Sequence, residues 1–386
     1  MKVKKVLILT TNYGDGHLKA AKSIERELLI KEPNIQVNII NLFQEAHPHI
    51  NECVRFLYLK CYSKFPKIYD MLYYSTKDIK RNFYINNLIG IFGKRKLKKF
   101  LREMQPDIVL NTFPVLAMPI LYKKGKTKIP CYTVITDYGL HSQWIDPGVS
   151  KYFIGHEVLY NQLVNQGVPS DKIEVTGIPV TIESEGITAE EFTKKYDIKS
   201  SKMPIVTLLA GANSVLSSLD KIVKKFYSME PKVQVIIICG KNKNLRERTC
   251  KLVEGRYEDR IKVLGFVDNL HEIMKGSDIV ISKAGGITTS EALNMNVPLI
   301  IFGSTAGQER ENTKFLSKSG CAYYARDYKQ LLDTLRNVLE NRKLIQDMIN
   351  NSSKIAVSGG SKKIADSIYK RISKINECVE IGSESK

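Results

Sequence analysis

Two histidine-containing turns are the first places where this sequence could do acid–base chemistry. The first, Asn12-Tyr13-Gly14-Asp15-Gly16-His17, follows an apolar run and leads into a predicted helix that starts near Leu18. A neutral imidazole such as His17 can take a proton from an attacking hydroxyl near pH 7. Gly14 and Gly16 would let backbone N–H groups, and an acceptor molecule, approach closely. The alternative is a histidine at a helix start that the backbone satisfies.

The second turn, Thr136–Trp144, places a carboxylate at the end of a buried run. Ligands of open α/β sheets bind at the carboxyl ends of strands, so we expect Asp137 to orient His17 or to hold an acceptor hydroxyl. His141 and Trp144, the only tryptophan, would line the acceptor pocket. An aspartate that merely caps the next turn is the alternative.

A third motif has the chemistry of a diphosphate site. After Ser282, two glycines turn the chain, and a helix starts with Thr-Thr-Ser and a carboxylate. Backbone amides and hydroxyls at a helix start can hold a diphosphate without a metal, and a carboxylate can accept hydrogen bonds from ribose hydroxyls. Ordinary helix capping is the alternative. The residues expected to bind are Gly285, Gly286, Ile287, Thr288, Thr289 and Glu291.

Two further loops favour ligand binding over capping at this motif. Gly211-Ala212-Asn213 follows the first predicted strand of the same half of the chain, and Gly307-Gln308-Glu309 follows the last. Three loops that converge on one cleft are hard to explain as three independent helix caps.

These turns need parallel sheets to position them. Short runs rich in valine and isoleucine alternate with helical patterns in two blocks, which predicts two doubly wound α/β domains that face a cleft. The domains would span 1–185 and 186–360, with a helix and a tail over 361–386. The predicted strands are Val6–Thr10, Val37–Asn41, Ile108–Thr112, Cys131–Thr136 and Tyr152–Gly155, then Ile205–Ala210, Val233–Cys239, Ile261–Leu264, Ile279–Ser282 and Pro298–Phe302.

Residues 46–104 interrupt this alternation. Lysines and arginines far outnumber acidic residues there and are interleaved with tyrosines and phenylalanines. Aromatic rings favour the bilayer interface, and clustered lysines favour anionic head groups. The segment is therefore predicted to be a membrane-associating insertion, and ordinary helices with solvated lysines are the alternative.

Composition narrows the class of protein. The 386 residues are 43% hydrophobic and 26% charged, which is typical of a globular protein, and the formal net charge of +19 favours anionic partners. Seven cysteines without a Cys-x-x-Cys pair argue against a disulfide framework or a zinc site. No apolar run is as long as the ~18 residues that span a bilayer. We expect a cytoplasmic protein bound peripherally to the inner face of the cell membrane, and we recognise no nucleic-acid module.

Taken together, the motifs resemble the diacylglycerol glycosyltransferases of glycosyltransferase family 28, which include bacterial processive diacylglycerol β-glucosyltransferases and monogalactosyldiacylglycerol synthases. The resemblance covers nearly the whole chain. It implies the two-domain GT-B fold, with the lipid acceptor on the N-terminal domain and the UDP-sugar on the C-terminal domain. The matching motifs are Gly14–His17, Thr136–Trp144, Gly285–Thr288 with Glu291, and Gly307–Glu309.

The resemblance also implies an activity: inverting transfer of a hexose, with glucose favoured over galactose, from a UDP-sugar to diacylglycerol, with repeated addition open. No metal or other cofactor is expected, because we recognise no carboxylate pair that would hold Mg²⁺. His17 would be the general base. Gly211 and Ala212 would lie near the phosphates, the Phe266–Val267 backbone near uracil, and Gln308 and Glu309 at the sugar. Ala284, where the bacterial glucosyltransferases have proline, leaves the turn intact but weakens the preference for glucose.

Three other functions stay open at this point. The first is transfer of N-acetylglucosamine to a polyprenyl-linked peptidoglycan precursor, by the related branch of the same family. The second is a UDP-N-acetylglucosamine 2-epimerase, which shares the fold but needs no membrane surface. The third, a nucleic-acid-binding protein, is suggested only by the positive charge.

Overall fold

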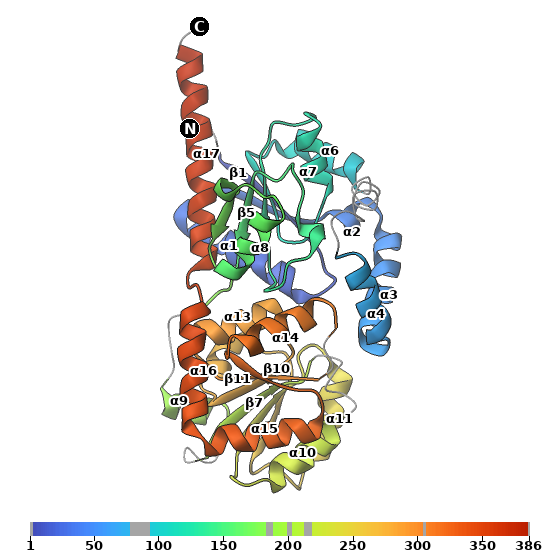
Figure 1. Cartoon of the computed structure of the whole chain (residues 1–386), viewed down its shortest axis with the longest axis vertical. Coiled ribbons are helices and arrows are strands. Elements are labelled where there is room, and N and C mark those ends of the chain that lie inside the picture. The colour runs from blue at the N-terminus through green and yellow to red at the C-terminus, as the bar shows by residue number, and fades with distance from the viewer. Residues whose placement is uncertain are drawn as a thin grey trace. The chain divides into compact units, whose positions relative to one another are not determined.

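The protein is described here by a computed structural model, which covers residues 3–77, 93–182, 188–198, 203–211, 218–303 and 306–384 (Figure 1). The chain forms two compact units. Unit 1 comprises Met1–Thr181 and Val357–Lys386, and unit 2 comprises Ile182–Ala356. The sequence analysis places the boundaries at 185/186 and 360/361 and does not assign the C-terminal segment to unit 1.

In its described part, unit 1 is built on a six-stranded parallel sheet of order β2-β1-β3-β4-β5-β6. The central strands are buried, and Val6 pairs with Val37 on one side and Ile108 on the other. The strand order reverses between β1 and β3, which is where open α/β sheets bind ligands. The strands are β1 (Lys5–Thr10), β2 (Gln36–Asn41), β3 (Ile108–Asn111), β4 (Cys131–Val134), β5 (Lys151–Ile154) and β6 (Ile173–Val175).

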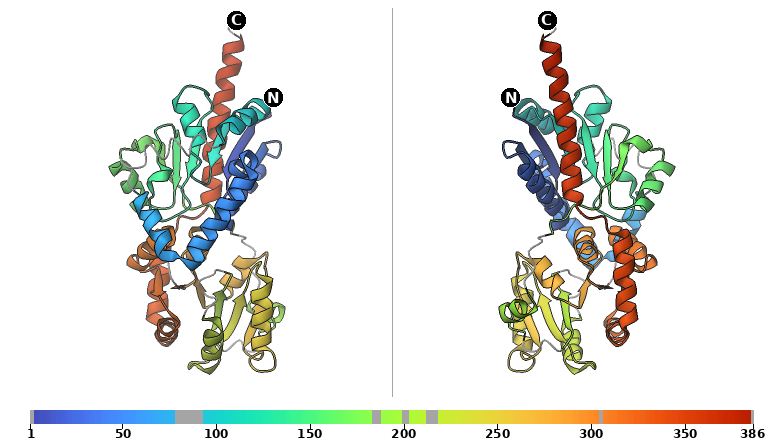
Figure 2. Two further views of the ribbon diagram at one scale, coloured as in Figure 1. Left: turned by 90° about the vertical axis from the view of Figure 1, so that its right-hand side faces the viewer. Right: turned by 90° about the vertical axis from the view of Figure 1, so that its left-hand side faces the viewer.

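Two long helices pack together on this sheet. In α1 (Asp15–Lys31), Ala21 and Ile24 share a buried cluster with Ile364 of α17 (Gly360–Glu384). Figure 2 shows α17 from two sides as one unbroken helix. The sequence analysis predicts a helix followed by a tail over 361–386, whereas α17 continues as a helix to Glu384. Shorter helices complete the unit: α7 (Ala117–Lys123), α8 (Glu157–Asn165) and the 3₁₀ turns η1 (Ser142–Trp144) and η2 (Ser170–Lys172).

The predicted insertion, 46–104, folds as helices in its described part, and its residues 78–92 lie outside that part. We call α3 and α4 together the α3–α4 arm. Each of its helices begins with a proline at its first position, where a missing N–H costs no hydrogen bond. No helix in the described ranges is both long and apolar enough to cross a membrane. The helices are α2 (Leu42–Ala46), α3 (Pro48–Lys64), α4 (Pro66–Ser75) and α6 (Lys94–Met104).

Unit 2 has a second parallel sheet, with six strands in its described part in the order β12-β11-β10-β7-β8-β9. Here the order reverses between β7 and β10. Aliphatic side chains bury both faces of the central strands. The strands are β7 (Ile205–Leu209), β8 (Gln234–Ile238), β9 (Ile261–Leu264), β10 (Ile279–Ser282), β11 (Leu299–Phe302) and β12 (Ala322–Ala325).

Helices cover this second sheet. The helix α9 (Ala189–Lys195) is the first helix in the described part of the unit, and Thr188 and Glu191 cap it reciprocally. The others are α10 (Leu219–Ser228), α11 (Lys243–Val253), α12 (Leu270–Lys275), α13 (Gly286–Asn294), α14 (Gln308–Lys318), α15 (Tyr328–Glu340) and α16 (Arg342–Ile355).

Candidate active site

His17 lies at the point where the strand order of unit 1 reverses. The helix α1 starts at Asp15 rather than near Leu18, so His17 stands in its first turn. Its Nδ1 is 2.8 Å from the carbonyl oxygen of Thr112 and 3.1 Å from Oγ1 of Thr136. A carbonyl oxygen can only accept, so Nδ1 carries the proton and donates it, and Nε2 keeps its lone pair. The ends of β1, β3 and β4 therefore meet around a histidine in the tautomer of a base.

The electrostatic surroundings keep this base neutral. Desolvation by neighbouring side chains lowers the pKa of His17 below its ordinary value of 6.5, and the carboxylate of Asp137 and the hydrogen bond to Thr112 raise it only in part. At neutral pH the ring is thus ready to accept a proton. The negative charge of Asp137 would stabilise the imidazolium that results.

Replacing Asp137 by asparagine is expected to change how kcat/KM depends on pH. The fall in kcat/KM on the acid side should occur at a lower pH than in the parent chain. A neutral base is active above its pKa, and removing the carboxylate removes an interaction that raises the pKa of His17. A pH–rate profile measures the shift. Asp171→Asn, on the exposed turn η2, is the matched control, and an acid limb that stays in place or moves upward in Asp137→Asn would contradict the coupling.

Aromatic rings extend from His17 to the α3–α4 arm. Phe113 lies edge-on to His17, with ring centres 5.1 Å apart, and the ring of Trp144, which is only 5% exposed, lies at 6.3 Å. Tyr13 is 5.8 Å from Phe113 and stacks at 5.8 Å on Tyr58 of α3. The sequence analysis gives Phe113 no role and counts Tyr58 only among the aromatic residues of the predicted membrane-associating insertion. The position of Phe113 directly after a strand is the signal that could have found it.

His141 holds α4 against the second turn. The backbone N–H of Gln143 donates to its Nδ1 at 3.2 Å, and its Nε2 donates to the carbonyl of Tyr73 at 3.2 Å. The hydroxyl of Ser142 donates to the carbonyl of Thr76 at 2.9 Å. Burial lowers the pKa of His141, which keeps it in the neutral form that these bonds require. Both ring nitrogens are thus engaged within the protein, at the end of α4, and a place for His141 in the acceptor pocket stays a prediction.

The predicted diphosphate motif lies at the corresponding point of unit 2. Gly285 is the N-cap of α13, which starts directly after β10 and next to β7. The N–H groups of the first helical turn have no partner within the helix. Among the described residues, the atom nearest to a methyl group built on Gly285 is Cε of Lys283, at 3.9 Å. The described side chains therefore leave room beside the Cα of Gly285.

The side chains of this helix start differ in direction. The hydroxyl of Thr289 is buried and donates back to the carbonyl of Gly285 at 2.8 Å, whereas Thr288 is half-buried. Ile287 and Glu291 are largely buried. Of the two threonines predicted to hold a diphosphate, the structure therefore commits the Thr289 hydroxyl to the helix.

The helix α14 braces the same loop. The amide of Asn312 donates to the carbonyl of Ala284 at 2.9 Å, and Nζ of Lys283 lies 2.7 Å from Oε1 of Glu309. Glu309 is buried, and Gln308 is half-buried at the start of the helix. The sequence analysis expects Gln308 and Glu309 at the sugar and misses Asn312, whose role depends on a contact that no local pattern reveals.

The remaining predicted donor residues follow β7 and β9. Gly211 lies beside Gly240, whose Cα would be 3.8 Å from a methyl group on Gly211. Phe266 is 57% exposed, with Nζ of Lys241 5.4 Å from its ring centre, and Val267 packs against the core. Ala212 and Asn213 lie outside the described residues. Among the residues described, no three His, Cys, Asp or Glu side chains gather as metal ligands would.

Comparison with known proteins decides the family. Residues 17–180 match the family model of monogalactosyldiacylglycerol (MGDG) synthase, and residues 209–371 match that of the glycosyltransferase family 28 C-terminal domain. A processive diacylglycerol β-glucosyltransferase of Bacillus subtilis (strain 168) is 32% identical over 370 residues, 95% of each chain. One from Bacillus cereus (strain G9842) is 36% identical over 349 residues, 90% of this chain and 88% of the other. The chain belongs to the diacylglycerol glycosyltransferases of family 28.

Solved structures confirm the predicted fold. MurG of Acinetobacter baumannii aligns with a TM-score of 0.58 at 15% identity, over 95% of this chain and 99% of that one. The S. aureus MnaA–UDP structure aligns with a TM-score of 0.62 at 16% identity, over 96% and 97%. At such identities the likeness shows the fold alone, which is GT-B with two Rossmann-like domains. Because a UDP-N-acetylglucosamine 2-epimerase shares it, the assignment to glycosyltransferases rests on the family match.

Proposed function

We propose that this diacylglycerol glycosyltransferase moves a hexose, glucose rather than galactose, from a UDP-sugar to the free hydroxyl of diacylglycerol with inversion at the anomeric carbon. The observation that carries the mechanism is the state of His17. Its Nδ1 proton is committed to the carbonyl of Thr112, and its pKa is lowered. A neutral Nε2 at the end of a sheet is what removal of a proton from an alcohol requires.

In the proposed reaction, Nε2 of His17 takes the proton of the acceptor hydroxyl while the hydroxyl oxygen attacks the anomeric carbon from the face opposite UDP. The bond between that carbon and the diphosphate oxygen breaks, and its electron pair leaves with UDP. The first-turn amides of α13, at Gly286–Thr288, stabilise the charge that develops on the diphosphate. In this proposal no metal ion or other cofactor is needed. The attached sugar presents new hydroxyls, so the same site could add a second sugar.

We further propose that unit 1 binds an anionic phospholipid surface, at the cytoplasmic face of the cell membrane, through the α3–α4 arm. An exposed large apolar side chain loses unfavourable contact with water when it enters a bilayer interface. The arm exposes a set of such side chains, and the aromatic rings described above link it to His17. The set comprises Ile50, Val54, Phe56, Leu57, Phe65, Ile68, Met71 and Leu72.

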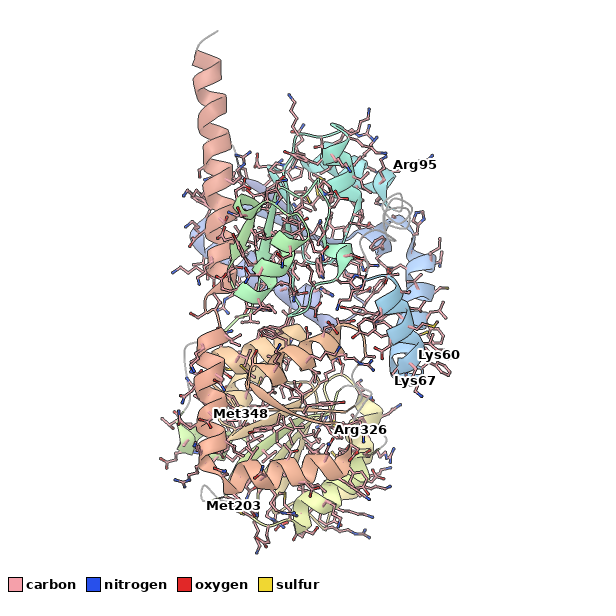
Figure 3. The ribbon with its side chains drawn as sticks, viewed as in Figure 1. Lys60, Lys67, Arg95, Met203, Arg326 and Met348 are labelled. Carbon is pink, nitrogen blue, oxygen red and sulfur yellow. The ribbon has the colours of Figure 1, made fainter. Side chains whose placement is uncertain are left out.

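Basic side chains accompany this apolar set. Figure 3 shows Lys60 on α3, Lys67 on α4 and Arg95 on α6 directed away from the body of unit 1. The helix α6 buries Leu97 in the core and exposes Arg95, Lys98 and other basic residues. Each Lys or Arg held near an anionic surface contributes about 1 kcal/mol to binding. An apolar face flanked by positive charge supports binding to anionic lipid rather than to a protein.

The deciding experiment is chromatography of the lipid products formed by the purified chain in vesicles that contain diacylglycerol, with labelled UDP-glucose and, separately, UDP-galactose. We expect glucosyl-diacylglycerol as the main product, with diglucosyl lipid at longer times. Parallel reactions supply UDP-N-acetylglucosamine with and without a polyprenyl-linked peptidoglycan precursor. Sugar transfer only to that precursor, or epimerisation of the donor without any lipid product, would overturn the proposal.

A further inference from the structure

Three hydroxyl groups form a chain of hydrogen bonds where the polypeptide leaves and re-enters unit 1. Oγ1 of Thr181 lies 3.0 Å from Oγ of Ser23 on α1, and Oγ of Ser23 bonds to Oγ of Ser361 at the start of α17. Oγ of Ser361 in turn lies 3.2 Å from the carbonyl oxygen of Val180. Ser23 and Ser361 are each only 3% exposed. We call Thr181, Ser23 and Ser361 the hydroxyl clamp.

The number of hydroxyl protons determines which group donates and which accepts in each hydrogen bond of the clamp. Each hydroxyl has a single proton, and the carbonyl of Val180 can only accept. Ser361 therefore donates to Val180, Ser23 donates to Ser361, and Thr181 donates to Ser23. Removing the Thr181 hydroxyl takes away the donor to Ser23, and removing that of Ser23 leaves the half-buried donor Thr181 and the buried acceptor Ser361 without their partner. Such losses are costly inside a protein.

The outgoing and returning segments also touch through their backbones. Gly177 has a φ of +88°, and a methyl group on it would lie 2.2 Å from the carbonyl oxygen of Val357. A methyl group on Gly360 would lie 3.0 Å from the carbonyl oxygen of Gly177. Only glycine allows this approach. The two connections to unit 2 are thus held together before either leaves unit 1.

The clamp is attached to the helix that carries the proposed base. Ser23 lies about 9 Å along α1 from His17, at the rise of an α-helix. Ile364 and Ile368 of α17 pack in the same cluster as Ile24 of α1, so the seam between the two helices is fixed beyond the clamp (Figure 1). Because Ser23 and His17 lie on the same helix, the hydrogen bonds of Ser23 hold Thr181 and Ser361 at a fixed distance from His17.

We propose that Thr181, Ser23 and Ser361 are positioning residues for sugar transfer. The inference rests on the proposed function, in which the base belongs to unit 1 and the UDP-sugar binds to unit 2. By tying both connections to α1, the clamp fixes where each connection leaves unit 1, on the same helix as the base His17, and both connections lead to the unit that would carry the donor sugar. A misplacement of about 1 Å between reacting groups can cost about 10²-fold in rate. Binding of UDP, which is completed within unit 2, does not depend on the clamp.

The test compares Thr181→Val, which removes the hydroxyl at constant shape, with Thr181→Ser, which keeps it, in the full-length chain. For Thr181→Val we expect transfer kcat to fall about tenfold, at an unchanged KM for UDP-glucose, and a larger share of UDP-glucose to be cleaved by water. Thr181→Ser should behave like the parent chain. Ser23→Ala with Thr181→Val should cost little more than Ser23→Ala alone, because the hydroxyls act as one chain.

The matched control is Ser367→Ala on α17. The hydroxyl of Ser367 donates to the carboxylate of Glu174 at 3.2 Å and takes no part in the hydroxyl clamp. Equal losses in Thr181→Ser and Thr181→Val, or a lower melting temperature with unchanged kcat and water cleavage, would overturn the proposal. Hydrogen exchange separates it from the proposed function, since it needs no turnover. Thr181→Val should speed amide exchange in both 177–182 and 357–361, and faster exchange in the first segment alone would refute the clamp. An absence of lipid product from the parent chain would instead refute the proposed function.

Discussion

Alanine in place of His17 is expected to lower kcat for sugar transfer by about 10²–10⁴-fold, the usual contribution of a positioned general base. The substitution removes Nε2 but leaves the carbonyl of Thr112 and the helix start of α13 untouched. Affinity for UDP should therefore stay the same. Steady-state transfer assays and calorimetric titration with UDP measure the two quantities.

The matched control for this substitution is His49→Ala, because His49 is an exposed histidine of α3 in the same unit. It should leave kcat unchanged. Melting temperatures of both variants show whether loss of the ring contact with Phe113 disturbs the fold. An unchanged kcat in His17→Ala would remove His17 as the base, and a loss of UDP affinity to match the loss of rate would assign it to donor binding instead.

Serine in place of Phe56, Leu57 and Met71 together is expected to weaken partition into anionic vesicles by about 10²–10³-fold. These side chains are 61%, 57% and 65% exposed, so the substitution removes apolar surface that would enter a bilayer but little that supports the fold. At about 25 cal/mol per Å² of apolar surface, each contributes on the order of 1 kcal/mol or more. Co-sedimentation with vesicles of phosphatidylglycerol and diacylglycerol at fixed salt measures the change.

The control for the arm is a second set of exposed apolar residues on the same unit. Leu29, Ile30 and Val158 lie on α1 and α8 and are also exposed. Their replacement by serine should leave partition unchanged. The triple arm variant should keep its transfer rate on acceptor dissolved in detergent. Equal partition of the arm variant and the parent chain would contradict binding through the α3–α4 arm.

Much of the fold could be predicted from sequence because buried parallel strands carry a strong pattern. Runs such as Val6–Thr10 and Ile279–Ser282 are apolar up to their last residue, and each is followed by glycine within a few residues. The short edge strands β6 and β12 were missed, since an edge strand needs no continuous apolar run. The start of α1 was placed too late because glycine is a poor helix former. In the structure Gly14 is the N-cap of α1, and Gly16 lies in its first turn.

Less of the site could be predicted, because its decisive contacts join residues that are far apart in the chain. His17 stood out by its type and position, but the partner that fixes its tautomer, Thr112, lies at the end of another strand. His141 stood out as a candidate pocket residue, but its bond to the carbonyl of Tyr73 could not be predicted from the sequence. The inward turn of the Thr289 hydroxyl depends on where the helix starts. Residue types reveal which groups could act, whereas three-dimensional contacts reveal which are already engaged.

Because the chain returns to unit 1 after Ala356, the order of its segments limits how this protein can be recombined with its relatives. Its last segment completes the half that the first residues begin, since α17 covers the apolar face of α1. Exchanging front and back halves between family members at a single crossover would pair an α1 from one parent with an α17 from another. A chimera made to change the donor sugar should instead have two crossovers, one at each end of Ile182–Ala356. Both segments of unit 1 then come from the same parent.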